Sequence, residues 1–312
     1  MAESFAPRRA TPVFTRLAII GIGLIGSSIA RAAKELNLAG TIVLADQDAA
    51  VRQRARELDL GHAVADTAAE AADGADHIIL CVPVGACGSV AAEIAPSLKA
   101  GAILSDVGSV KGSVVDAVLP HLPEGVSFVP AHPVAGTENS GPDAGFPSLF
   151  LNRWCILTPP EGTDAAAIAK TRQFWEGMGA LVEVMSAQHH DLVLAVTSHL
   201  PHLIAYNIVG TAEDLEAVTQ SEVIKFSAGG FRDFTRIAAS DPTMWRDVFL
   251  HNKEAVLEML GRFNEDLALL TRAIRYGDGE TLHKHFTRTR AIRRGIVALG
   301  QEKPETEKLR KD

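Results

Sequence analysis

The chain has 312 residues, of which 47% are hydrophobic and 22% charged, a composition that excludes a disordered or collagen-like chain. At roughly 150 residues per domain, this length predicts two domains. Thirty Lys and Arg against 38 Asp and Glu give a net charge of -8. Such a chain lacks the positive field that binds phosphate backbones, so we expect no nucleic-acid partner. An anionic small substrate has to be held by a few local cations.

Cysteine usage and hydropathy indicate the compartment. Cys81, Cys87 and Cys155 form no C-x-x-C pair, which favours a reducing, cytoplasmic environment and predicts neither a disulfide framework nor a zinc site. The N-terminus has no apolar region typical of a secretory signal. Residues 17–33 are almost uncharged, but they are short for a membrane span and are interrupted by glycines, so we expect no membrane association.

In the first half of the chain, short β-branched runs alternate with Ala-rich helical stretches. This alternation predicts an α/β fold with a doubly wound parallel sheet and helices on both of its faces. The predicted strands are Val13–Ile20, Thr41–Ala45, His77–Val82, Ala102–Asp106, Ser127–Pro130, Trp154–Thr158 and Leu181–Met185, and the predicted helices are Gly26–Leu36, Ala49–Leu58 and Ala86–Leu98.

From Ala187 onward the strand pattern stops and apolar residues recur at spacings of three and four, which predicts an all-helical second domain. The helices are expected at His189–Thr211, Leu215–Phe226, Pro242–Tyr276 and Gly279–Leu299. We therefore place a dinucleotide-binding domain at residues 13–186 and a helical substrate and dimerisation domain at 187–300. Residues 1–12 and the charged residues 301–312 are expected to be flexible tails.

A G-x-G-x-x-G run, Gly21–Gly26, follows the first strand and opens the first helix. In this context each glycine has a function: Gly21 permits the turn, Gly23 lets backbone N–H groups reach a pyrophosphate, and Gly26 lets helix and strand pack closely. Together with the domain pattern, the run predicts a Rossmann-type nucleotide site. The alternative is a glycine-rich turn that binds nothing.

Asp46 and the pair Val82–Pro83, at the end of the next predicted strand, complete this predicted site. Asp46 ends the second strand, twenty residues after Gly26, where it would bind the ribose hydroxyls and repel a 2′-phosphate; the preferred cofactor is therefore NAD rather than NADP. The residues expected to bind the cofactor are Gly21, Gly23, Leu24, Ile25, Gly26, Asp46, Val82 and Pro83.

Four more stretches are polar and rich in Gly or Pro where patterning does not require it: Asp106–Gly112, His132–Glu138, Thr197–His202 and Gly229–Ala238. With the glycine run, and with Asn139–Gly141, Leu149–Phe150 and Ser240–Trp245, they resemble the prephenate/arogenate dehydrogenase family. The resemblance extends in order from about Leu17 to about Gly300.

The resemblance implies an NAD-dependent oxidative decarboxylation in tyrosine biosynthesis, acting on prephenate, arogenate or both, and a homodimer. By this analogy His132 binds the C4 hydroxyl and Ser109 supports it, so both are assigned to catalysis. The residues implied in substrate binding are Thr137, Glu138, Ser198, His202, Arg236, Gly229 and Asp233, the last lying near the partner's active site.

Several of these residues also have simpler interpretations. Ser109 would serve as the cap of a helix that starts near Val110, and Arg236 would form a surface ion pair with Asp233 instead of binding a carboxylate. His199 and His202 suggest a metal pair, but no third ligand has suitable spacing. Pro201 predicts a kink in its helix.

Two other functions remain open at this point. One is a different two-domain NAD-dependent dehydrogenase that acts on a hydroxy acid and uses another base, often Lys. The other is a non-catalytic dinucleotide sensor, which would keep the glycine turn and have no need for His132 beside Ser109.

Overall fold

The structure is a computed structural model that describes residues 8–219 and 225–298. Its contacts divide the chain into two compact units, Met1–Val256 and Leu257–Asp312. The predicted tails at 1–12 and 301–312 lie largely outside the described residues, as does part of the predicted helix at 215–226.

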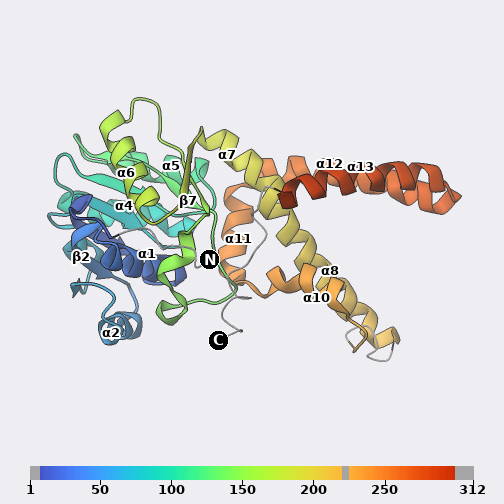
Figure 1. Cartoon of the computed structure of the whole chain (residues 1–312), viewed down its shortest axis with the longest axis horizontal. Helices are drawn as coiled ribbons and strands as arrows, with labels where there is room; N and C mark the ends of the chain where they lie inside the picture. The colour runs from blue at the N-terminus through green and yellow to red at the C-terminus, as the bar shows by residue number, and fades with distance from the viewer. Residues whose placement is uncertain (1–7, 220–224, 299–312) are drawn as a thin grey trace. The chain divides into compact units, whose positions relative to one another are not determined.

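Six parallel strands form the central sheet of the first unit (Figure 1). They are β1 (Phe14–Ile20), β2 (Ala39–Ala45), β3 (Ala63–Val64), β4 (His77–Leu80), β5 (Ile103–Asp106) and β6 (Ser127–Phe128), in the spatial order β3-β2-β1-β4-β5-β6. Ile20 is paired with Ala45 on one side and with Leu80 on the other, so the carboxyl ends of the three strands meet at one edge. Ligands bind at such an edge in doubly wound folds, and the predicted parallel sheet is confirmed.

Helices cover both faces of this sheet and create two apolar cores. They are α1 (Leu24–Glu35), α2 (Ala49–Glu57), α3 (Ala68–Ala72), α4 (Cys87–Ile94), α5 (Gly112–Val118) and α6 (Ala165–Gly177). Alternate residues of β1 enter different cores: Leu17 and Ile19 pack with α1 and α6, whereas Ala18 and Ile20 pack with α3, α4 and α5. Short turns join these elements: η1 (Val84–Ala86), η2 (Ala95–Ser97), η3 (Leu119–His121), η4 (Pro142–Ala144) and η5 (Pro147–Phe150).

A second, three-stranded sheet corrects the prediction of one continuous parallel sheet. β7 (Ala131–Pro133) pairs antiparallel with β8 (Trp154–Leu157), which pairs parallel with β9 (Leu181–Val184). Only Val129 and Pro130 separate β7 from β6, too short a connection for a parallel crossover. The apolar runs at 154–158 and 181–185 were correctly predicted as strands, but their periodicity contains no information about which sheet they join.

The helical part begins with α7 (Ala187–Leu194), a π-helical turn η6 (Ala195–His199) and α8 (Leu200–Thr219). It continues with α10 (Gly229–Thr235), η7 (Arg236–Ala239), α11 (Pro242–His251), α12 (Lys253–Tyr276) and α13 (Gly279–Ala298). The predicted single helix 242–276 is interrupted at Asn252, which has φ −114° and ψ 34° and donates from its side chain to two neighbouring groups. The first residues of the predicted helix 215–226 continue α8 as far as Thr219.

By length and composition, the stretch Ala187–Asp214 would be compatible with a membrane span, with a mean hydropathy of 1.4 in its most apolar window. It also contains the buried polar residues His190, Asp191 and His199, which bind other parts of the first unit. In the single chain 28% of this window is buried, and its buried polar side chains are hydrogen-bonded, as buried polar groups of folded proteins are.

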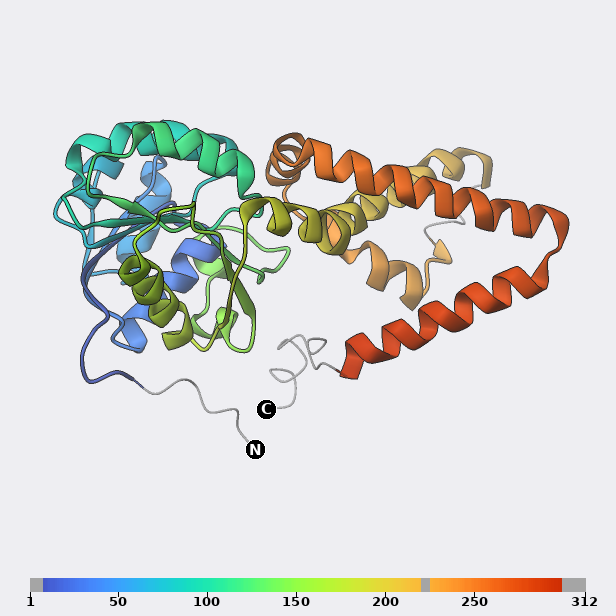
Figure 2. The same cartoon turned by 90° about the horizontal axis from the view of Figure 1, so that it is seen from above.

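Within the described residues, the second unit consists of α12 from Leu257 onward and the whole of α13 (Figure 2). The turn between the two helices contains Gly277, which has φ +68°. Large apolar side chains remain exposed along both helices of the single chain. They include Leu257, Leu267, Leu269, Ile274, Tyr276, Phe286, Ile292 and Ile296, which are between 48% and 74% exposed. Apolar surface of this extent is typical of an interaction face.

Candidate active site

The predicted nucleotide turn lies at the carboxyl end of β1. Gly21 has φ +97°, and a Cβ at this position would collide with the carbonyl oxygen of Cys81. A Cβ on Gly26 would collide with the carbonyl oxygen of Gly21, so the turn and the helix can approach this closely only with glycine at both positions. Gly23 is the N-cap of α1 without any side-chain cap, and a Cβ there would meet no atom within 4 Å. The helix start is thus open to an anion.

Asp46 lies beside this turn. Its Oδ2 accepts a hydrogen bond from the amide of Ile22 (2.8 Å) and its Oδ1 accepts one from the amide of Asp48 (2.9 Å). Arg52 donates to the carbonyl oxygens of Asp46 and Gln47 and is therefore engaged in local structure.

The remaining predicted cofactor residues lie at the same edge: Leu24 and Ile25 are half-buried in the first turn of α1, and after β4 Val82 is half-buried and Pro83 exposed. An open helix start with a carboxylate at the end of β2 suits the pyrophosphate and ribose of NAD.

A buried ion pair ties the end of β5 to the start of β7. Lys111 and Asp106 are both fully buried, and the Lys111 ammonium bonds to Asp106 Oδ2 and to the carbonyl oxygen of Ala131 (2.8 Å). Burial raises the pKa of Asp106, although the adjacent ammonium opposes the shift. Because Ala131 immediately precedes His132, this pair fixes the backbone that carries the predicted catalytic histidine.

His132 lies on β7 with only 6% of its surface exposed. Its Nδ1 is 2.8 Å from Nε2 of His190 on α7, and Nδ1 of His190 is 2.8 Å from Oδ1 of Asp191. Asp191 in turn accepts hydrogen bonds from the amides of Lys111 and Gly112, both at 2.8 Å. Burial, together with the neighbouring His190 and Lys111, holds the pKa of His132 well below its ordinary value, so the imidazole is neutral at neutral pH.

A second histidine cluster lies along η6 and α8. His199 is fully buried; its Nδ1 accepts a hydrogen bond from the Asn252 side chain (3.1 Å), and burial lowers its pKa to about 4. His202 donates from Nδ1 to the carbonyl oxygen of Ser198 (2.9 Å) and stacks on Trp245 with ring centroids 3.6 Å apart. The π turn η6 ends two residues before Pro201, so the backbone departs from a regular α-helix next to this proline.

The loop after β7 meets η7 through one ion pair. Arg236 Nη1 lies 3.0 Å from Glu138 Oε2, with the side chains 60% and 40% exposed. The simpler interpretation of Arg236 as a surface ion pair therefore has a different partner, Glu138 instead of Asp233. Thr137 accepts from the amide of Asn139, while Gly229 and Asp233 lie exposed on α10.

Ser109 lies half-buried in the turn between β5 and α5. The alternative that it caps the following helix was wrong, because α5 starts at Gly112 and its N-cap residue is Lys111. In the described structure His132 bonds to His190 rather than to the Ser109 hydroxyl.

The interpretation of the sequence missed four residues of this site: Lys111, His190, Asp191 and Asn252. Lys111 belongs to the polar stretch Asp106–Gly112, but the sequence pattern assigned it no role. A His-His-Asp run at the start of a helix was the available signal for His190 and Asp191, but it gives no hint of a contact with His132, 58 residues earlier.

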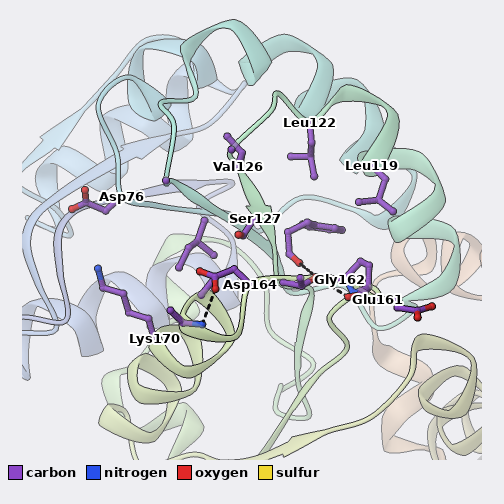
Figure 3. A pocket seen from close by; sticks show the side chains of 17 residues that line it. Asp76, Leu119, Leu122, Val126, Ser127, Glu161, Gly162, Asp164 and Lys170 are labelled. Carbon is purple, nitrogen blue, oxygen red and sulfur yellow. Dashed lines mark hydrogen bonds between the residues drawn. The ribbon is translucent and has the colours of Figure 1, made fainter.

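A cavity of about 610 Å³ lies elsewhere in the first unit, at the amino ends of β4, β5 and β6 (Figure 3). Its lining includes Asp76, Leu119, Ser127, Asp164 and Lys170 and none of the predicted site residues. The cofactor turn follows the carboxyl end of β1, and His132 lies on β7, which comes after the carboxyl end of β6. The cavity at the amino ends of the strands is therefore separate from the candidate active site.

A Rossmann-type sheet with an open glycine turn and an Asp at the end of β2, combined with a buried neutral histidine, defines an NAD-dependent dehydrogenase. Comparison with known proteins then gives the family. The family model for the prephenate dehydrogenase nucleotide-binding domain matches residues 29–184, and that for the prephenate dehydrogenase dimerization domain matches residues 186–288. The chain belongs to the prephenate dehydrogenase family, which confirms the resemblance read from the motifs.

Individual relatives agree with this assignment. The chain is 48% identical over 281 residues to a cyclohexadienyl dehydrogenase of Zymomonas mobilis, which covers 90% of this chain and 96% of the relative. It is 34% identical over 279 residues to a prephenate dehydrogenase of Bacillus subtilis, with coverage of 89% and 75%. The crystal structure of Aquifex aeolicus prephenate dehydrogenase with hydroxyphenyl propionate and NAD+ superimposes with a TM-score of 0.84, at 33% identity over 90% of this chain and 98% of that one.

Proposed function

We propose that this chain oxidatively decarboxylates prephenate, arogenate or both, with NAD as the hydride acceptor, in tyrosine biosynthesis. The observation that carries the proposal is a buried, neutral His132 on β7, in a chain that has the open glycine turn and both domains of the prephenate dehydrogenase family.

The reaction needs one proton acceptor, two anion sites and correct orientation. Hydride leaves C4, the C4 hydroxyl proton moves to His132, and the ring carboxylate leaves as CO2. The proton then returns to the phenolic oxygen of the aromatic product. Bound at the Gly21–Gly26 turn and Asp46, NAD supplies the acceptor for the hydride.

Further residues are proposed to bind the substrate. Arg236 is the cation for a substrate carboxylate, because guanidinium binds carboxylate as a bidentate fork and here it already pairs with a carboxylate, that of Glu138. We propose that substrate displaces Glu138 from this pair. Ser109, Thr137, Ser198, His202, Gly229 and Asp233 complete the proposed substrate residues.

We also propose a homodimer and a cytoplasmic enzyme. The helical half matches the family's dimerization domain, and its last two helices expose apolar side chains. We place the nucleotide-binding domain at residues 13–186 and the helical domain at residues 187–300. The two family models also meet near residue 185. The division by contacts within the chain falls later, after Val256.

One set of assays tests the proposal. NADH formation is measured with prephenate, arogenate and simple hydroxy acids, each with NAD and with NADP. We expect turnover with prephenate, arogenate or both, and a preference for NAD. Turnover of hydroxy acids alone would support a different dehydrogenase, and NAD binding without any turnover would support a sensor.

A further inference from the structure

Two buried residues on α7 connect His132 to a fixed anion. His132 Nδ1 faces His190 Nε2, and His190 Nδ1 faces Asp191 Oδ1, each at 2.8 Å. His190 is fully buried and Asp191 is 9% exposed. Buried polar groups are hydrogen-bonded to one another, so the donors and acceptors of these three side chains have to match.

When both imidazoles are neutral, only one assignment of the ring protons satisfies these hydrogen bonds. A carboxylate only accepts, so His190 donates to Asp191 from Nδ1. His190 Nε2 then carries the lone pair and accepts, which requires His132 to donate from Nδ1. The remaining lone pair of His132 is on Nε2, the ring nitrogen that points away from this chain of bonds.

We propose that His190 and Asp191 are positioning residues that hold His132 in the Nδ1–H tautomer and so make Nε2 the proton-accepting atom. This inference rests on the proposed function of His132 as the base. Its logic is that of a Ser-His-Asp triad, in which the carboxylate sets the tautomer and orientation of the imidazole and stabilises the imidazolium that forms.

The backbone fixes the anion at the end of the chain of bonds. Asp191 accepts from the amides of Lys111 and Gly112, at the start of α5, and its own carbonyl oxygen accepts from Asn252 (2.8 Å). Burial alone would raise the pKa of Asp191, but the hydrogen bonds from His190 and from these two amides together lower it. Asp191 therefore stays ionised at neutral pH.

Other charged and titratable groups also face this network. The Lys111 ammonium opposes a positive charge on His132 and on His190, and His199 opposes one on His132. Asp106, which binds Lys111, favours the charged form of His190. Burial is the largest influence and lowers the pKa of both His132 and His190. A transient imidazolium at His132 is thus costly unless Asp191 compensates it through His190.

The test uses the full-length enzyme with two variants and a neighbouring control. His190→Asn keeps an amide that reaches Asp191 and removes the acceptor for His132 Nδ1–H. Asp191→Asn replaces the acceptor for His190 by an amide that also donates. His189→Asn is the control, because His189 precedes His190 on the same helix with an exposed side chain. For each protein, kcat, KM and the pH profile are measured, and the Kd of NAD checks the fold.

We expect His190→Asn and Asp191→Asn to lower kcat by about 10- to 100-fold, with the Kd of NAD unchanged. Losses of this size follow the removal of the hydrogen-bond partners that orient metal-binding histidines in metalloenzymes. In a His132→Asn background the same substitutions should cost nothing further, because they act through His132. His189→Asn should match the wild type.

Three other outcomes are distinguishable. Near wild-type kcat in both α7 variants, with His132→Asn inactive, would overturn the relay and leave the base assignment intact. Losses that persist in the His132→Asn background, or that extend to NAD binding, would assign a structural role and overturn it as well. An active His132→Asn enzyme would instead contradict the proposed role of His132.

Discussion

His132 is 6% exposed, and the groups that face it are His190, Lys111 and His199. At the scale of a single residue, this environment keeps the imidazole neutral, which a general base requires. His132→Asn keeps a hydrogen-bonding side chain of similar size but cannot take up the proton. We expect kcat to fall by about 10²–10⁴-fold and the Kd of NAD to stay unchanged.

The pH dependence of kcat/KM gives a second measurement of the same residue. Because burial lowers the pKa of His132, the acidic limb of the wild-type profile should lie below the ordinary histidine value of about 6.5. His132→Asn should lose this limb. A variant with near wild-type kcat, when chemistry is shown to be rate-limiting, would move the base elsewhere, and His202 would be the next candidate.

We propose that Asp46 determines the choice of cofactor. Its carboxylate is held by the amides of Ile22 and Asp48. In Rossmann-type sites an acidic residue at the end of the second strand binds the ribose 2′-hydroxyl and would repel a 2′-phosphate. Asp46→Ala should weaken NAD binding and narrow the difference in kcat/KM between NAD and NADP. Equal efficiency with both cofactors in the unaltered enzyme would contradict this role of Asp46.

The position of the start of α1 depends on how closely this helix approaches β1. A Cβ on Gly26 would collide with the backbone of Gly21, so Gly26→Ala has to shift the turn or the helix. We expect a loss of NAD affinity measured by titration. Gly210→Ala is the matched control: it lies inside α8 with no atom within 4 Å of a new Cβ, and alanine should stabilise that helix. Tight NAD binding by Gly26→Ala would show that the close approach is dispensable.

Local pattern predicted most of the elements, since strand and helix periods, the glycine turn and the end of β2 are all encoded in neighbouring residues. It missed the short strands β3 and β7 and the helices α3, α6 and α10. The fold class, the NAD cofactor and the family resemblance are confirmed by the structure and the comparisons. The pairing of β7 with β8 and the contact of His132 with His190 join residues far apart in the sequence. Such pairings depend on how the chain turns back after β6, which no local pattern specifies.

The exposed apolar faces of α12 and α13 predict self-association. Leu267 and Ile274 are seven residues apart on α12 and are 48% and 68% exposed. We expect light scattering of the wild type to give twice the 33.2 kDa chain mass. The double variant Leu267→Asp, Ile274→Asp should shift the protein toward the monomer, because it buries two charges in an apolar interface.

Ala165→Asp is the control for the dimer, since it adds a negative charge to an exposed position in the first turn of α6, where helices tolerate acidic residues. It should stay dimeric. A monomeric wild type at micromolar concentration would contradict the dimer.

The buried histidines also make the stability of the whole molecule depend on pH. Burial lowers the pKa of His77 to about 3 and that of His199 to about 4, and it lowers those of His132 and His190 as well. The unfolded chain takes up protons near pH 6.5, but the folded chain does not. The stabilisation is therefore complete above about pH 6.5 and is lost as pH falls toward the folded pKa values. Asp106 acts in the opposite direction, because burial raises its pKa.

Urea unfolding at fixed protein concentration, between about pH 8 and pH 5, measures this effect. Each such histidine should lower the free energy of unfolding by up to about 1.4 kcal/mol per pH unit below 6.5. His77→Gln should make this slope shallower, whatever its effect at the higher pH, because it removes one group that the folded chain cannot protonate. His121→Gln, at an exposed position, should leave the slope unchanged. A free energy of unfolding that stays constant down to about pH 5 would mean that protons reach these imidazoles in the folded chain as readily as in the unfolded one.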